Sequence, residues 1–204
     1  LYFLDAPENT RAEIRRDYVP LVRRHAQQAD GVICVSEYTA SEARLLLEVP
    51  PERIAVIPNG VDPAFRVPPP PEAIDTVLNR RRLPRGAILY IGTDEKRKNL
   101  VNLAMAHMGL ARRGHRVPPL VLVGPGSHWV HAGSVMGSHI HATGYLETRE
   151  IRALMAASVA LVLPSLEEGF GLPVVEAMAA GLPIVATDVG GNIDLYSTLP
   201  GGQA

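Results

Sequence analysis

Two glutamates and the glycine-rich stretch between them are the residues of this sequence best suited to chemistry. Residues 164–187 read PSLEEGFGLPVVEAMAAGLPIVAT, in which Glu168 and Glu176 bracket Gly169 and Gly171. Glycine lets the backbone approach a ligand closely, so nearby amides can reach a phosphate group. Carboxylates accept hydrogen bonds from hydroxyl groups. The stretch therefore suits an anionic ligand that also carries hydroxyls.

The flanking residues predict the elements that position this stretch. The apolar run 158–163 predicts a buried parallel strand, and 183–187 predicts a second one. A helix is expected over 173–181, because Pro173 fits a first helical turn and Gly181 fits a helix end. Ligands of such units bind at the carboxyl ends of the strands, and a helix N-terminus favours an anion by roughly 0.3–1 kcal/mol. The spacing alone leaves open that Glu176 merely complements the helix dipole and that the glycines are ordinary turn residues.

The segment from Glu168 to Ala179 resembles the E-x7-E signature of the retaining family-4 glycosyltransferases, which have the GT-B fold. The flanking residues PSL and AGLPIVATDVGG match as well, and weaker similarity covers most of residues 30–195. In that family the first glutamate contacts the donor sugar, and the second bonds the ribose hydroxyls of the nucleotide. The resemblance implies these roles for Glu168 and Glu176. It implies contacts to sugar and phosphate for the residues between them: Gly169, Phe170, Gly171 and Leu172.

A basic cluster supports the same interpretation. The chain has two lysines against eighteen arginines, and both lysines lie within KRK at 96–98, after the apolar run 88–91. Arg97 and Lys98 match the R-K-N element whose cations neutralise the leaving diphosphate in the family; Lys96 is given no role. Many members carry an arginine where this chain has Thr93, so one phosphate cation is absent. The alternative, a solvated charge run, is weakened because cations oppose the dipole at a helix start.

Further residues are expected near the nucleotide because they follow strands. By resemblance these are Gly92 and Thr93, Gly124, and the pair Tyr145 and Leu146. Trp129 stands where a dinucleotide fingerprint needs its third glycine, which argues against that kind of site. Tyr145 could equally pack in the core.

Composition limits the remaining functions. The net charge of −1 gives no argument for nucleic-acid binding, and the single Cys34 excludes a disulfide framework and indicates a reducing compartment. No run of residues approaches the length of a membrane span. We therefore expect a cytoplasmic protein; contact of its basic clusters, Arg80–Arg82 included, with an anionic membrane stays open. Four histidines (128, 131, 139 and 141) hint at metal but lack a complete ligand set, so no metal or cofactor is expected.

Strand and helix patterns alternate through the second half of the chain. Strands are expected near 87–92, 119–123, 139–143, 159–163 and 183–187, with helices near 99–114, 147–157 and 173–181. This predicts an α/β fold of GT-B type with a doubly wound parallel, Rossmann-like sheet. We expect three parts: the end of an incomplete acceptor-side domain at 1–66, a stiff proline-rich linker at 67–85, and a donor-binding domain at 86–204.

The combined hypothesis is a hexosyltransferase. It would move a sugar, as a guess mannose-like, from a GDP- or UDP-linked donor to a glycan, lipid-linked or small-molecule acceptor, with retention and without metal. Glu168, Arg97 and Lys98 would carry the reaction. A non-catalytic sugar-nucleotide-binding module is the alternative, since much of the acceptor side is expected to be missing. A nucleotide-dependent oxidoreductase is disfavoured by the absent fingerprint.

Overall fold

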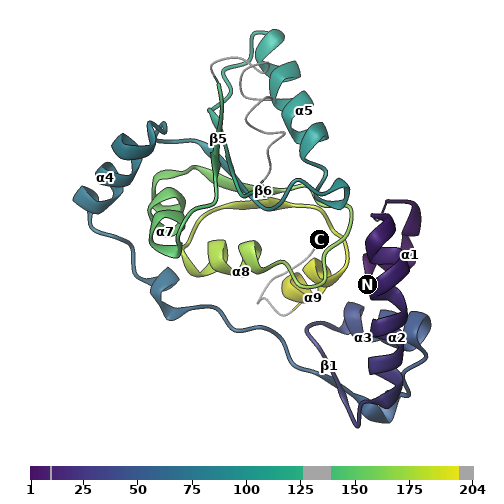
Figure 1. Ribbon diagram of the computed structural model, residues 1–204. Helices are drawn as coiled ribbons and strands as arrows, with labels where there is room; N and C mark the ends of the chain where they lie inside the picture. Colours follow the sequence, from purple (N-terminus) through teal and green to yellow (C-terminus); the bar gives the residue numbers. More distant parts are fainter. Residues whose placement is uncertain (10, 126–138, 198–204) are drawn as a thin grey trace. The chain divides into compact units, whose positions relative to one another are not determined.

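The computed structural model describes residues 1–9, 11–125 and 139–197 (Figure 1). The chain divides into two compact units. The first comprises Leu1–Gly60, Glu167–Gly171 and Asp188–Ala204, and the second comprises Val61–Leu166 and Leu172–Thr187. Each unit is described separately below.

The second unit is built on a parallel sheet of five strands. The strands are β3 (Ile88–Ile91), β4 (Leu120–Val123), β5 (Ile140–Gly144), β6 (Ala160–Leu163) and β7 (Ile184–Ala186). They lie in the order β5-β4-β3-β6-β7, and every neighbouring pair is parallel. Helices α5 (Leu100–Arg112), α7 (Thr148–Ala157) and α8 (Leu172–Ala179) connect them (Figure 1). The predicted doubly wound α/β sheet is confirmed.

The strand order reverses between β3 and β6. From β3 the chain proceeds outward to β4 and β5, then returns to β6 on the other side and continues to β7. The inner strand β4 is buried at all four residues, so apolar side chains cover both faces of the sheet there. Leu89, Val121 and Leu161 join a core with residues of α7 and α8, whereas Leu100 and Ala104 of α5 are buried elsewhere. In open sheets of this kind a crevice forms at the reversal point, next to the carboxyl ends of the two strands.

The segment expected to be an extended linker is largely helical. Of residues 67–85, α4 occupies Pro71–Arg81 and is capped by Pro70 in extended conformation. The last of the four prolines stands at the first helical position, where its missing N–H leaves no hydrogen bond unmade. Ile74 and Leu78 of α4 enter the same core as the sheet. The proline run therefore starts a packed helix; the expected domain boundaries stay a prediction.

Two arginines of α4 pair with a buried glutamate of α7. Glu150 is 2% exposed; Arg81 donates to its carboxylate at 2.9 and 3.1 Å, and Arg80 makes a further short contact. Glu150 also completes a capping box with Glu147. These hydrogen bonds outweigh burial and lower the pKa of Glu150 to about 2, with Arg81 the largest cause. Arg80 and Arg81 thus hold α4 on α7, a structural role for part of the basic cluster.

Replacing Glu150 by glutamine is expected to destabilise the protein by roughly 2 kcal/mol near neutral pH. The depressed pKa means that the ionised carboxylate stabilises the fold above about pH 4.5, and that this stabilisation is lost as the pH falls toward about 2. Urea denaturation at pH 7 and at pH 3 should therefore give a smaller difference in unfolding free energy between wild type and Glu150→Gln at the lower pH. Asp75→Asn, which breaks the exposed Arg85–Asp75 pair, is the control and should change little. A difference that is independent of pH would contradict this role.

The first unit contains a small parallel pair of strands covered by helices. Its elements are α1 (Tyr2–Asp5), a π-helical turn (Ile14–Tyr18), α2 (Val19–Gln28), β1 (Val32–Cys34), α3 (Glu37–Leu47), β2 (Ile54–Val56) and α9 (Gly191–Ser197). Pro20 lies in the first turn of α2, directly after the π-helical turn, and the helical run continues past it. The cap of α3 is Ser36, whose side chain accepts from the Thr39 amide.

Candidate functional site

The carboxyl ends of β3 and β6 form the centre of the candidate site in the second unit. β3 is followed by Gly92 and by the short helical turn Lys96–Lys98, and β6 is followed by Pro164. The Leu166 amide donates to the Arg97 carbonyl at 2.6 Å, and the Asn99 side chain donates to the Pro164 carbonyl at 3.0 Å. The basic turn is thereby fixed beside the first residues of the glycine-rich stretch. This is the reversal point of the sheet, where ligands of such folds bind.

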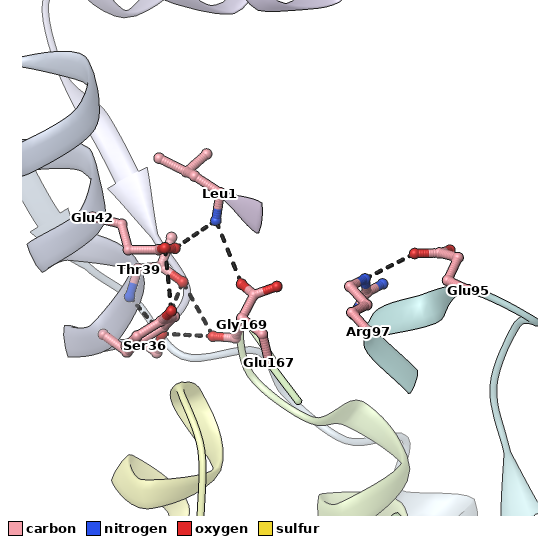
Figure 2. A network of polar contacts seen from close by, with 9 residues as sticks. Leu1, Ser36, Thr39, Glu42, Glu95, Arg97, Glu167 and Gly169 are labelled. Carbon is pink, nitrogen blue, oxygen red and sulfur yellow. Dashed lines mark hydrogen bonds and ion pairs between the residues drawn. The ribbon is translucent and has the colours of Figure 1, made fainter. Parts of the chain in front are cut away.

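The side chains of the basic turn have different surroundings. Lys98 is buried, Arg97 is partly buried and Lys96 is exposed. The Arg97 guanidinium donates to Glu95 at 2.8 Å (Figure 2). The Thr93 hydroxyl donates to the same carboxylate at 2.7 Å. Burial alone would raise the pKa of Glu95, but these two hydrogen bonds and the nearby cations lower it. An ionised Glu95 therefore orients Arg97, a role that the sequence analysis did not assign.

Three glycines join the strand ends at this edge of the sheet. The Gly92 amide donates to the Val123 carbonyl at 2.9 Å, and the Gly124 amide donates to the Gly144 carbonyl at 3.0 Å. Gly124 has a φ of 144°, and a Cβ there would lie 1.9 Å from the Gly92 carbonyl oxygen. Gly124 is thus required so that β3 and β4 can end side by side.

Of the two candidate residues that follow β5, Tyr145 is exposed and Leu146 is buried. The Tyr145 side chain is 76% exposed, which excludes the core-packing alternative. Leu146 is buried among the side chains of the main core. Its side chain is therefore structural, and only its backbone could border a nucleotide.

The middle of the glycine-rich stretch belongs to the first unit. Glu168 and Phe170 are buried, and Gly171 has a φ of 82°, the left-handed conformation that favours glycine. The Gly191 amide donates to the Glu168 carbonyl at 2.7 Å. The hydroxyls of Ser36 and Thr39 lie 2.6 and 3.2 Å from the Gly169 carbonyl oxygen (Figure 2). These contacts hold the loop backbone, and the sequence analysis did not foresee them.

The helix that follows carries the second glutamate. α8 begins at Leu172, with Pro173 in its first turn as predicted, and Glu176 is partly buried in it. Burial raises the pKa of the Glu176 carboxyl. Within the part of the chain that the structure describes, no hydrogen bond or ion pair to this carboxylate is found. A half-buried acceptor of this kind is well suited to a ligand hydroxyl.

Glu176→Gln is expected to raise the melting temperature of the unliganded protein at pH 7. A raised pKa means that the folded state disfavours the ionised carboxylate, so wild-type stability falls as the pH rises from the unfolded pKa through the folded one. The glutamine variant avoids this loss, and the difference should vanish below about pH 4. Thermal denaturation at both pH values measures it. The exposed Glu52→Gln, with the same charge change, should have little effect, and a lower melting temperature for Glu176→Gln at pH 7 would contradict the interpretation.

The candidate residues fall into two groups. The second unit contains the strand-end and helix residues: Gly92, Thr93, Arg97, Lys98, Gly124, Tyr145, Leu146, Leu172 and Glu176. The first unit holds the loop residues: Glu168, Gly169, Phe170 and Gly171. His128 and His131 lie outside the described residues. No cluster of metal-ligating side chains occurs in the described ranges, and no helix there is long and apolar enough to cross a bilayer.

Comparison with known families assigns the chain. The family described as Glycosyl transferases group 1 matches residues 85–198, more than half of the sequence. The chain belongs to this family. The family described as Glycosyltransferase Family 4 matches residues 3–65, most of which lie in the first unit.

Individual relatives agree with this assignment. The chain is 32% identical over 165 residues to O-antigen chain mannosyltransferase B of Escherichia coli, covering 78% of this chain and 43% of the relative. It is 32% identical over 185 residues to the MMP alpha-(1->4)-mannosyltransferase of Mycolicibacterium hassiacum, covering 87% of this chain and 42% of the relative. The chain thus spans about half the length of the curated relatives that it matches.

Solved structures of glycosyltransferases share the fold. Anabaena HepE in complex with UDP-glucose superposes with a TM-score of 0.72 at 24% identity, covering 94% of this chain and 53% of HepE. The lipopolysaccharide glycosyltransferase WaaG gives a TM-score of 0.71 at 22% identity, covering 89% of this chain and 52% of WaaG. Together with the parallel sheet, these likenesses establish the GT-B type of fold for this member of the family.

Proposed function

We propose that the protein is a hexosyltransferase that uses a nucleotide-diphospho-sugar as donor. The observation that carries the proposal is the pairing of the basic turn with residues 164–166, which lead into the E-x7-E stretch, at the reversal point of the sheet. The bonds from Leu166 to Arg97 and from Asn99 to Pro164 hold the two segments together. Membership of the group 1 glycosyl transferases and similarity to two mannosyltransferases support it. A mannose-like donor linked to GDP or UDP is the first choice to test.

In the proposed mechanism the cations act on the leaving diphosphate. Arg97, oriented by Glu95, and the buried Lys98 would stabilise the negative charge that grows on the nucleotide as the glycosidic bond breaks. The positive end of α8 at Leu172 would add to this field. Because protein cations supply this charge, the proposed reaction is metal-independent.

The two glutamates and the loop amides would bind the uncharged parts of the donor and its phosphates by hydrogen bonds. Glu176 would accept hydrogen bonds from the ribose hydroxyls, and Glu168 would bind hydroxyls of the transferred sugar. Backbone amides of Gly169, Phe170 and Gly171 would bind sugar and phosphate. Gly92, Thr93, Gly124, Tyr145 and Leu146 would line the nucleotide side. The acceptor would attack the anomeric carbon on the same face of the sugar from which the leaving group departs, and this would retain the anomeric configuration.

The test is a donor panel with two readouts. Calorimetry with GDP- and UDP-linked hexoses measures binding, and product analysis with glycan, lipid-linked and small-molecule acceptors measures transfer and anomeric configuration. Transfer in the presence of a chelator is the expected result. Binding without turnover in the full-length protein would favour a non-catalytic sugar-nucleotide-binding module, and the absence of both would overturn the proposal.

A further inference from the structure

The backbone carbonyls of the loop between Glu167 and Gly171 are held by neighbours within the first unit. The Glu168 carbonyl accepts from the Gly191 amide at 2.7 Å. The Gly169 carbonyl receives the Ser36 hydroxyl at 2.6 Å and the Thr39 hydroxyl at 3.2 Å. Ser36 is 2% exposed, so its hydroxyl is removed from competing water. The bond to Gly169 is therefore a persistent restraint on the loop.

The proton inventory of these two hydroxyls supports a joint role. The Thr39 amide donates to the Ser36 oxygen at 3.0 Å, which makes Ser36 the cap of α3 and leaves its proton available. The two hydroxyl oxygens lie 2.9 Å apart, but each hydroxyl has only one proton to donate. If one hydroxyl donates to the other, only one of the two protons reaches the Gly169 carbonyl oxygen. Both protons are used on that oxygen when each hydroxyl donates to it directly. Figure 2 shows the two side chains converging on that oxygen.

Fixing a carbonyl fixes the amide on the other side of the same peptide. No peptide bond in the described chain is cis, so the Phe170 N–H points away from the Gly169 carbonyl oxygen. Neither the Gly169 nor the Phe170 amide has a hydrogen-bond acceptor within residues 1–9, 11–125 and 139–197. Phe170 is nevertheless buried, and buried amides without an acceptor are rare. Such amides are expected to serve a ligand.

We infer that Ser36 and Thr39 are positioning residues that aim the Phe170 amide at the donor. The inference rests on the proposed function, in which the loop amides bind sugar and phosphate. Neither residue touches the donor; each acts through the Gly169–Phe170 peptide. The shorter and more buried bond gives Ser36 the larger effect.

The experiment compares substitutions in the full-length protein. Ser36→Ala is expected to lower kcat with the preferred donor about 10-fold to 100-fold, and Thr39→Val about 3-fold to 10-fold. Thr39→Ser keeps the hydroxyl and should therefore have the kcat of the wild type. Binding of the nucleoside monophosphate alone should change less than about twofold in every variant, because that ligand lacks the sugar and the second phosphate. The double variant should lose less than the product of the single effects, since both hydroxyls act on one carbonyl.

Controls separate positioning from stability and from the proposed function itself. Ser41→Ala removes a hydroxyl that bonds the Glu37 carbonyl at 3.0 Å on the same helix, and it should leave kcat unchanged. Hydrogen exchange of residues 167–171 should accelerate in Ser36→Ala and Thr39→Val but not in Ser41→Ala. If the wild type transfers sugar while both variants keep kcat and exchange within twofold, the inference is overturned. If the wild type transfers nothing, the proposed function fails, and the exchange rates still decide whether the two hydroxyls restrain the loop.

Discussion

Replacing Lys98 by methionine is expected to lower kcat for sugar transfer about 100-fold to 1000-fold, the usual effect of removing one preorganised group from a developing negative charge. Lys98 is 8% exposed, whereas Lys96 projects into solvent. Water screens a buried ammonium little, so its attraction for a diphosphate is far stronger than that of a surface lysine. Methionine keeps the length and flexibility of the side chain and removes the charge. Steady-state kinetics with the preferred donor measures the change.

Lys96→Met is the matched control for this prediction. Lys96 lies two residues from Lys98 in the same helical turn, but its side chain is exposed. The two substitutions produce the same change in net charge. We expect kcat within about threefold of wild type, because surface charges are screened by salt. Thermal denaturation of both variants verifies that the fold survives. Equal losses in the two variants would show that only the general positive field matters, and unchanged turnover in Lys98→Met would remove Lys98 from the mechanism.

The sheet was predictable because strands of this kind depend on local patterns. Each expected strand from 87–92 to 183–187 overlaps a strand of the structure, since short β-branched runs between turn residues suit a buried parallel sheet. The position of α8 followed from Pro173 and Gly181, which have fixed backbone preferences at helix ends. The roles of the loop residues were implied by the resemblance of the E-x7-E stretch, and they stay a prediction.

The features that could not be predicted from the sequence depend on contacts between distant segments. Ser36 and Thr39 reach Gly169 across more than a hundred residues, and no local spacing signals such a bond. Serine directly before a helix is a strong cap, so a local pattern can indicate the start of α3 at Ser36 but not the bond from Ser36 to Gly169. The helix α4 was missed because prolines indicate an extended chain until one is placed at a first helical position. The pairing of Arg80 and Arg81 with Glu150 again required the tertiary structure.

Gly124→Ala is expected to destabilise the protein by roughly 4 kcal/mol, at the upper end of single substitutions, and to abolish donor binding. The new Cβ would lie 1.9 Å from the Gly92 carbonyl oxygen and 2.8 Å from its carbon. Both atoms belong to the backbone, so no side-chain rotation relieves the clash. The Gly92 amide is bonded to Val123 and the Gly124 amide to Gly144, so a shift at either glycine breaks the strand ends apart. The basic turn that follows β3 would move with them.

Two other glycines of the same unit separate the causes of this effect. Gly109 lies inside α5 with nothing within 4 Å of the position that a Cβ would occupy, so Gly109→Ala should stabilise the protein by roughly 0.5–1 kcal/mol through helix propensity. Gly144 has a φ of 70° with equally open surroundings, and Gly144→Ala should cost only about 1–2 kcal/mol for its left-handed conformation. Urea denaturation and donor calorimetry of the three variants give the comparison. If Gly124→Ala is no worse than Gly144→Ala, backbone conformation alone explains the glycine; a much larger loss, with donor binding gone, means that the close approach of β3 and β4 is what holds the diphosphate end of the site in place.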